Sequence, residues 1–247
     1  MSDRKIYNFA GLVFLLIIWQ IMSYTMPSIV VASPADTFRA FIKLTLSGYF
    51  WTNFFISFQR IFSGILWGGL AGFLLGIAAG LNKPLKYMLE PLRWVLISIP
   101  AVVIVVVAML WFGMGSGMVI FITGIMISPI IYINTVKGFE SIDEKLVEMS
   151  NIYKFSKSLK IRHLYVPFIT MHLVSGFVIV AGLGVRVVVL AEVLGASEGI
   201  GYALAVTRTN LDVPEMFSWV ILCIIIVAVF ENLLLKPFES LTLRWRS

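Results

Sequence analysis

Long apolar runs alternate with polar connections along the whole chain. The runs cover residues 7–24, 54–81, 91–112, 118–136, 168–191 and 217–235. A helix that spans a bilayer needs about 20 predominantly apolar residues. Each run is long enough for this, and in lipid a helix satisfies its own backbone hydrogen bonds. The pattern predicts an all-α, polytopic membrane protein with about six transmembrane helices in a single domain over residues 1–247.

Composition supports the membrane prediction. Hydrophobic residues make up 60% of the chain, charged residues make up 13%, and the mean hydropathy is +0.96. Soluble domains have about 45–50% apolar and about 25% charged residues. A water-soluble enzyme and a disordered chain are both excluded. The first run is interpreted as a retained span, since it is long for a cleavable signal peptide and its removal would release only further spans.

Glycine follows a regular step within the second run. The stripe consists of Gly64, Gly68, Gly72, Gly76 and Gly80. Residues four apart lie on one side of a helix, and small residues there allow two backbones to approach closely in a bilayer. The stripe favours tight packing within the chain's own helix bundle. A seam between two subunits is the alternative.

Two further segments have features of their own. Ser33 and Pro34 signal a turn, and Asp36 is expected to cap an amphipathic helix that runs to about Leu46 on the outer surface. Pro100 interrupts the third run and removes one backbone hydrogen bond. A simple kink is expected at Pro100, while a broken helix that lines a transport pathway is the alternative.

Lysine and arginine are distributed unevenly among the connections. Most of the 19 cationic residues fall at the two ends of the chain, in residues 82–93 and in residues 137–166. The opposite side carries Arg39, Lys43 and Arg208. Positive charge favours the cytoplasmic side of a membrane. Both termini and the 137–166 segment are therefore expected in the cytoplasm, and the basic excess needs no nucleic-acid partner.

The 142–164 segment alternates charged with apolar residues at helical spacing. A solvated amphipathic linker would show this pattern, and so would a docking element that inserts into a groove of another protein. The spacing favours docking, because the segment resembles the cytoplasmic EAA motif of permease subunits in binding-protein-dependent ABC importers. In that motif, E-A-A is followed after three residues by Gly and after nine more by I-x-L-P. The matching positions are Glu148, Met149, Ser150, Lys154, Leu164, Val166 and Pro167.

Several of these positions depart from the motif. Met149 and Ser150 replace the alanines, and Lys154 replaces the glycine that allows a sharp bend between two short helices. A lysine at that bend must either avoid a positive φ or carry modest strain.

Other segments resemble the nitrate-, sulfonate- and taurine-type permeases of that family. The resemblance runs from Ser33 to the C-terminus. It rests on S-x-x-R-x-x-x-G at Ser57, Arg60 and Gly64, on I-P at Pro100, on L-W-F-G-x-G ending at Gly115, and on A-E…G-x-G-Y from Ala191 to Tyr202.

The resemblance implies a multi-subunit machine in the inner membrane. Two permease copies, expected as a homodimer, would enclose the path of a small solute, with nitrate-, sulfonate- or taurine-like anions as the expected class. Separate ATPase subunits, which hold ATP and Mg²⁺, would bind the coupling segment. An extracytoplasmic solute-binding protein would deliver the solute. The residues of the EAA-like segment would then be mechanical contacts.

No catalytic constellation competes with this interpretation. The chain has no Gly-Lys dipeptide and hence no phosphate-binding P-loop, and its lone Cys223 and two histidines lack metal-ligand spacing. Residues 195–199 match G-x-S-x-G in letters, but no histidine follows Ser197. The chain itself is therefore not expected to be an enzyme or to hold a cofactor or metal. A secondary transporter driven by an ion gradient and a membrane-embedded enzyme are the rival hypotheses.

Arg60 and Arg186 fall inside apolar runs, where a charge is costly. Each is expected either to reach interfacial water or to pair with an acid such as Glu192. The alternative places Arg60, Pro100 and Arg186 along the path of an anionic solute, since a guanidinium binds oxyanions with two hydrogen bonds.

Overall fold

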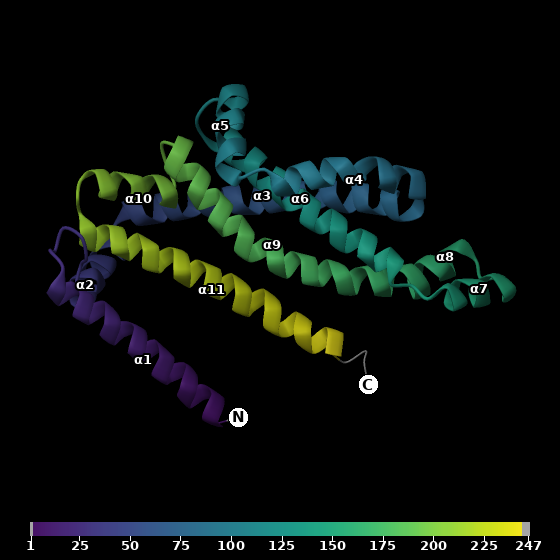
Figure 1. The fold of residues 1–247 in the computed structure, drawn as a ribbon, viewed down its shortest axis with the longest axis horizontal. Coiled ribbons are helices and arrows are strands. Elements are labelled where there is room, and N and C mark those ends of the chain that lie inside the picture. Colours follow the sequence, from purple (N-terminus) through teal and green to yellow (C-terminus); the bar gives the residue numbers. More distant parts are fainter. Residues whose placement is uncertain (1, 244–247) are drawn as a thin grey trace.

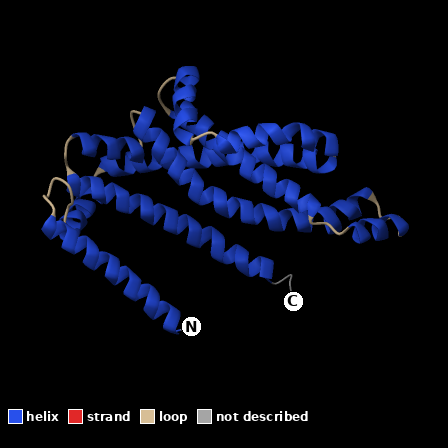
Figure 2. Ribbon diagram, viewed as in Figure 1, coloured by secondary structure: helices blue, strands red, loops and turns tan. Residues whose placement is uncertain are grey.

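The fold is entirely helical over the residues that the computed structural model describes, which are 2–243 for the backbone and 6–229 for side chains (Figures 1 and 2). The helices are α1 (Ser2–Thr25), α2 (Pro34–Thr45), α3 (Gly48–Leu81), α4 (Lys83–Ser98), α5 (Ala101–Phe112), α6 (Ser116–Glu140), α7 (Glu144–Ile152), α8 (Lys157–Lys160), the π-helix η1 (Ile161–Tyr165), α9 (Val166–Gly195), α10 (Ile200–Thr209) and α11 (Val213–Leu243). The terminal cations Arg4, Lys5, Lys236, Arg244 and Arg246 lie outside the described side chains.

The described residues contain four helices that are long and apolar enough to cross a membrane: α1, α3, α6 and the continuous helix from Lys157 to Gly195. A fifth span forms if α4 and α5 are one bent unit, and the described part of α11, Val213–Val229, adds a shorter apolar helix. The polytopic all-α prediction is confirmed, while the count of six spans is not.

Helices α3, α6 and α9 form the centre of the bundle (Figure 1). Helices α2 and α10 lie together at one end of the long axis, and α7 and α8 lie at the other. Helix α1 ends and helix α11 starts near α2 and α10, and both helices extend obliquely away from that end. The ends of the bundle are thus occupied by different polar segments, as the alternation of runs and connections predicts.

The glycine stripe of α3 packs against α6. A methyl group added at Gly64 or Gly76 would overlap the side chains of Thr123 or Thr135, and one added at Gly72 would overlap the carbonyl of Ser128. The two backbones therefore approach more closely than any side chain at these positions would allow. The prediction that the stripe packs inside the chain's own bundle is confirmed.

Pro100 separates α4 from α5 by a bend of 100°. Ile99 ends α4 in an extended conformation (φ −73°, ψ 126°), as the residue before a proline prefers. The Pro100 carbonyl then accepts hydrogen bonds from the amides of Val103 (3.0 Å) and Ile104 (3.4 Å), and this starts a new helix. The expected simple kink is therefore wrong, because two separate helices meet here at 100°.

The short amphipathic helix is present as α2, but its cap differs from the expected one. Ser33 is the N-cap residue, and its Oγ accepts a hydrogen bond from the Asp36 amide at 3.1 Å. Its hydroxyl also donates to Asp36 Oδ2 at 2.7 Å. Asp36 thus lies in the first turn, where its charge suits the positive end of the helix.

A buried ion pair joins α3 to α9 near the α10 end of the bundle. Arg60 Nη1 lies 2.8 Å from Glu192 Oε1, and these side chains are 4% and 0% exposed. The Ser57 hydroxyl lies 2.8 Å from both oxygens of Glu192. Arg60 also donates to Ser116 Oγ at 3.0 Å and to the Glu198 carbonyl at 2.7 Å. The expected pairing of Arg60 with Glu192 is confirmed.

The same cluster holds the start of α10. The amides of Gly199, Ile200 and Gly201 donate to Asn53 Oδ1 (2.7 Å), Ser57 Oγ (2.8 Å) and Glu192 Oε2 (2.9 Å). A helix N-terminus leaves such amides without partners and favours nearby negative charge. Gly199 has a φ of +109° and a Cβ there would overlap the Glu192 carboxylate, so a glycine is required. Side chains remote in sequence therefore cap α10.

Substitution of Gly72 by alanine should lower the free energy of unfolding by about 1–3 kcal/mol, since overpacking a filled contact forces the helices apart. Gly117→Ala is the matched control, because a Cβ at Gly117 would meet nothing within 4 Å. Unfolding of both variants in mixed detergent micelles measures the difference. Equal midpoints would show that α3 and α6 do not pack through this stripe.

Substitution of Glu192 by glutamine should destabilise the fold by about 3–5 kcal/mol, because Arg60 would stay buried without its counter-charge. Glu90→Gln is the control, since it breaks only the partly exposed pair with Arg93 (3.3 Å), and such pairs are worth about 0–1 kcal/mol. The double variant Arg60→Met/Glu192→Met should recover part of the loss. A Glu192→Gln variant as stable as the Glu90→Gln control would refute the account of this cluster.

Candidate functional site

The EAA-like segment projects beyond the end of the bundle as α7 and α8 (Figure 1). Helix α7 starts at an N-cap, Asp143, whose Oδ1 accepts a hydrogen bond from the Lys145 amide at 2.9 Å. Ile142, just before the cap, is buried. The segment is thus anchored where it leaves α6, and its helix is formed by local capping interactions.

Lys154 adopts the left-handed backbone conformation that favours glycine. Its φ is +52°, its amide donates to the Asn151 carbonyl at 3.0 Å, and the Phe155 amide donates to the Ser150 carbonyl at 2.9 Å. These two bonds form a Schellman motif, in which glycine is the usual residue at the left-handed position. The sharp bend is therefore preserved in this chain, and a non-glycine residue in that region costs roughly 1–2 kcal/mol.

The bend places α7 and α8 against one another. Ser156 caps α8 by accepting a hydrogen bond from the Leu159 amide at 3.3 Å. Lys160 Nζ donates to Asn151 Oδ1 at 2.5 Å, and this bond connects the two short helices. The motif residues therefore form one compact hairpin of helices.

The end of the motif joins this hairpin directly to the membrane helix. Leu164 is buried in the π-helix, while Val166 and Pro167 form the first turn of α9. Pro167 has no N–H to donate to the preceding turn, and the wider π-turn occurs where that α-helical bond is missing. Helices α8, η1 and α9 form one continuous helix from Lys157 to Gly195.

Apolar side chains of the hairpin face outward. Ile152 is 76% exposed, Tyr153 is 72% exposed, and Met149 and the neighbouring Glu148 are also exposed. Ser150 is buried, with its hydroxyl donating to the Val147 carbonyl at 2.7 Å. A protruding helix with exposed apolar side chains beside a charged one is typical of a protein-binding surface.

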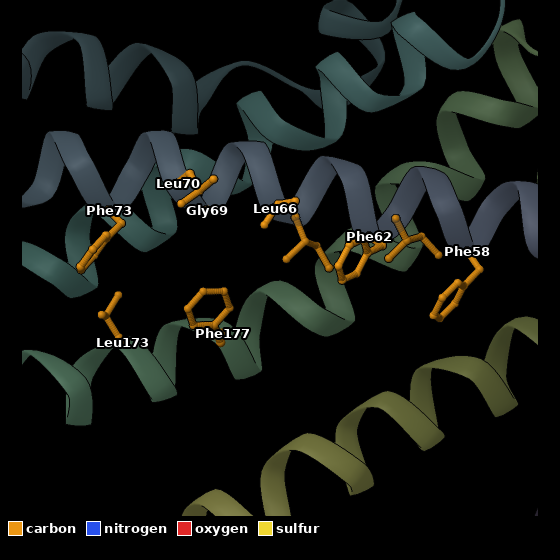
Figure 3. A pocket seen from close by; sticks show the side chains of 10 residues that line it. Phe58, Phe62, Leu66, Gly69, Leu70, Phe73, Leu173 and Phe177 are labelled. Atoms are coloured by element: carbon orange, nitrogen blue, oxygen red, sulfur yellow. The ribbon is translucent and has the colours of Figure 1, made fainter.

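A groove of about 540 Å³ lies between α3 and α9 and is lined by apolar side chains (Figure 3). Phe58, Phe62 and Phe73 come from α3, whereas Leu173 and Phe177 come from α9. This lining contains no charged residue. The lining is apolar, like the interior of a membrane, and it has no group that would attract an ion.

A second groove, of about 680 Å³, lies between α9 and α11 and includes Arg186. Arg186 is exposed, whereas Arg60 is buried in its ion pair with Glu192. Pro100 lies at the break between α4 and α5. Of the residues predicted to line a path, Arg186 is thus on a groove surface, Arg60 holds the bundle together, and the three positions do not form one cluster.

Sequence reasoning missed how the α10 cap is assembled. Ser57, Arg60, Glu192 and the glycines after it were recognised as separate signature segments, and Asn53 was not singled out. A polar Asn and Ser one turn apart, aligned with an arginine on an apolar helix, were the signal that a buried polar cluster was present.

Comparisons with known proteins agree with this geometry. A family described as the binding-protein-dependent transport system inner membrane component matches residues 68–235. A Bacillus subtilis protein named as an aliphatic sulfonate permease, SsuC, is 26% identical over 93% of this chain and 84% of its own length. The nitrate import permease protein NrtB of Synechococcus elongatus is 33% identical over 60% of this chain and 53% of its own length.

The fold is also found among solved structures. A chain of a bacterial alginate ABC transporter, solved with an alginate-bound periplasmic protein, has a TM-score of 0.64 at 14% identity, with 96% of each chain covered. The family match covers most of the membrane bundle, from the middle of α3 into α11. The chain therefore belongs to the binding-protein-dependent transport system inner membrane component family and is a permease subunit of an ABC transporter, a transport protein and not an ATPase.

Proposed function

We propose that this permease forms the translocation path of an ATP-driven importer for a small anionic solute, and that the α7–α8 hairpin binds a separate ATPase subunit. One observation carries the proposal. The hairpin presents Met149, Ile152 and Tyr153 to solvent at the end of the bundle and continues directly into α9. ATP and Mg²⁺ would be held by the ATPase, and nucleotide-driven movement of the hairpin would tilt α9.

The arrangement of the hairpin suits a docking element. A short amphipathic helix binds by placing its apolar side chains in a groove of the partner. Glu148, exposed beside Met149, would add a charged contact that fixes orientation. The Schellman bend keeps the two short helices at a fixed angle, so that a push on α7 is not absorbed by a flexible loop.

The other proposed partners are a second copy of the permease and a protein that docks at the end opposite the hairpin. A second copy of this chain would complete the path, as the homodimer that the resemblance implies would do. A solute-binding protein would dock at the α2 and α10 end. Both termini would then lie in the cytoplasm of an inner membrane, in agreement with the distribution of lysine and arginine.

The anionic class of solute rests on two supports. The names of SsuC and NrtB refer to aliphatic sulfonates and nitrate, which are both oxyanions. Arg186 supplies a cation in the groove between α9 and α11. Selection among oxyanions would belong to the solute-binding protein.

Glu148→Arg reverses a charge on the hairpin, and Ile152→Asp places a charge where an apolar contact with the partner is proposed. Each substitution should remove most of the ATPase that co-purifies with the permease. Loss of a central interface residue typically costs about 2 kcal/mol or more. Because both side chains are exposed, the unfolding midpoint of the permease should not change.

Glu198→Arg is the matched control for this experiment. Glu198 is also exposed, but it lies beyond the far end of α9, next to α10. This variant should retain the ATPase fully. Retention of the ATPase by both hairpin variants, with intact folding, would contradict the docking role.

A further inference from the structure

Arg186 is the charged residue in the lining of the groove between α9 and α11. Val185, Val189, Leu190 and Val193 line it from α9, and Cys223, Ile224, Val227 and Ala228 line it from α11. Its volume of about 680 Å³ falls within the range of roughly 300–1,000 Å³ that is usual for small-molecule sites. One cation with apolar walls makes this groove chemically different from the wholly apolar groove between α3 and α9.

Arg186 lies within α9, a helix that is long and apolar enough to span a membrane. Helix α9 ends at Gly195, about two and a half turns beyond Arg186, which corresponds to about 13 Å at 1.5 Å per residue. The hydrocarbon core of a bilayer is about 30 Å thick. Arg186 therefore lies inside the apolar length of α9 and not at its terminus.

An arginine within a membrane-spanning helix needs either water or a counter-charge. A charge at the bilayer centre costs about 2.5–3.5 kcal/mol on insertion scales, so such residues face a cavity or a protein partner. Among the described side chains, the ion pairs involve Arg39, Arg60, Lys86 and Arg93, and no carboxylate pairs with Arg186. Within the described side chains, Arg186 therefore lacks the counter-charge that Arg60 has.

We propose that the α9–α11 groove is the anion-binding station of the translocation path and that Arg186 binds the oxyanion of the solute. A guanidinium offers a planar pair of N–H donors that matches a nitrate or sulfonate group. The valines and isoleucine of the groove would contact the alkyl chain of a sulfonate. This inference rests on the proposed function and assigns its solute a site on this chain.

Cys223 provides a direct probe of the groove. It is the single cysteine of the chain and lines the same groove as Arg186. The test uses the complete importer in membrane vesicles. It measures the rates at which two membrane-impermeant methanethiosulfonates, one carrying an ethylsulfonate and one a trimethylammonium group, modify Cys223.

In the wild type the sulfonate reagent should react faster than the cationic reagent. The substitution Arg186→Gln should reduce this rate ratio by about tenfold, because a unit charge in the lining of the same groove favours one reagent and disfavours the other. Arg186→Lys should keep most of the ratio. The control Arg208→Gln, which removes an exposed arginine on α10, should leave it unchanged.

The other outcomes overturn the inference in distinguishable ways. Failure of both reagents to modify Cys223 would show that the groove faces lipid. Dissociation of the permease dimer in Arg186→Gln would show that the counter-charge is a carboxylate of the second copy. Binding of the ATPase, measured in the same samples, separates these outcomes from a failure of the proposed function, since Arg186 lies far from the hairpin.

Discussion

The buried ion pair between Arg60 and Glu192 is the interaction on which the organisation of this permease depends. It joins two residues that are 132 positions apart in the sequence, and the same Glu192 carboxylate caps α10 through the Gly201 amide. The turn between α5 and α6 is tied to the same place, because the Gly115 amide donates to the Gly195 carbonyl at 3.0 Å. Inside a membrane, water cannot replace a lost partner, so each of these groups must be satisfied by the protein. The signature segments around Ser57 and Arg60, at Gly115 and from Ala191 to Tyr202 thus meet in one polar junction.

This junction and the glycine stripe have complementary mechanical consequences. The stripe brings α3 and α6 into backbone contact along their length, and the ion pair fixes α9 to α3 at one end. Toward the other end, α9 continues through η1 and α8 into the hairpin without a flexible connection. A helix held at one end and displaced at the other tilts as a rigid body. The bundle is therefore suited to convert a displacement at α7 into a change in the grooves that α9 shares with α3 and α11.

Much of this architecture is predictable from the sequence because apolar run length and glycine spacing act locally. The membrane helices, α2 and the packing of Gly64 and Gly72 within the bundle follow from such patterns. The sequence predicts a kink at Pro100 but not the 100° angle between α4 and α5. A missing backbone hydrogen bond sets no angle, because the angle depends on what the next helix packs against. The sequence alone does not decide whether Lys154 has a positive φ, because tertiary context determines whether a lysine tolerates that strain. The capping of α10 by Asn53 and Ser57 depends on three-dimensional proximity, which spacing does not contain.

The central claim is that ATP binding and hydrolysis on partner subunits drive solute through this permease. Its most direct test is uptake of a short labelled alkanesulfonate, and of nitrate, into vesicles that contain the permease with its ATPase and solute-binding protein, with ionophores present to collapse ion gradients. The account predicts uptake of at least one of these anions that requires ATP and all components and that is insensitive to the ionophores. Uptake by the permease alone, driven by a sodium or proton gradient and abolished by ionophores, would contradict it.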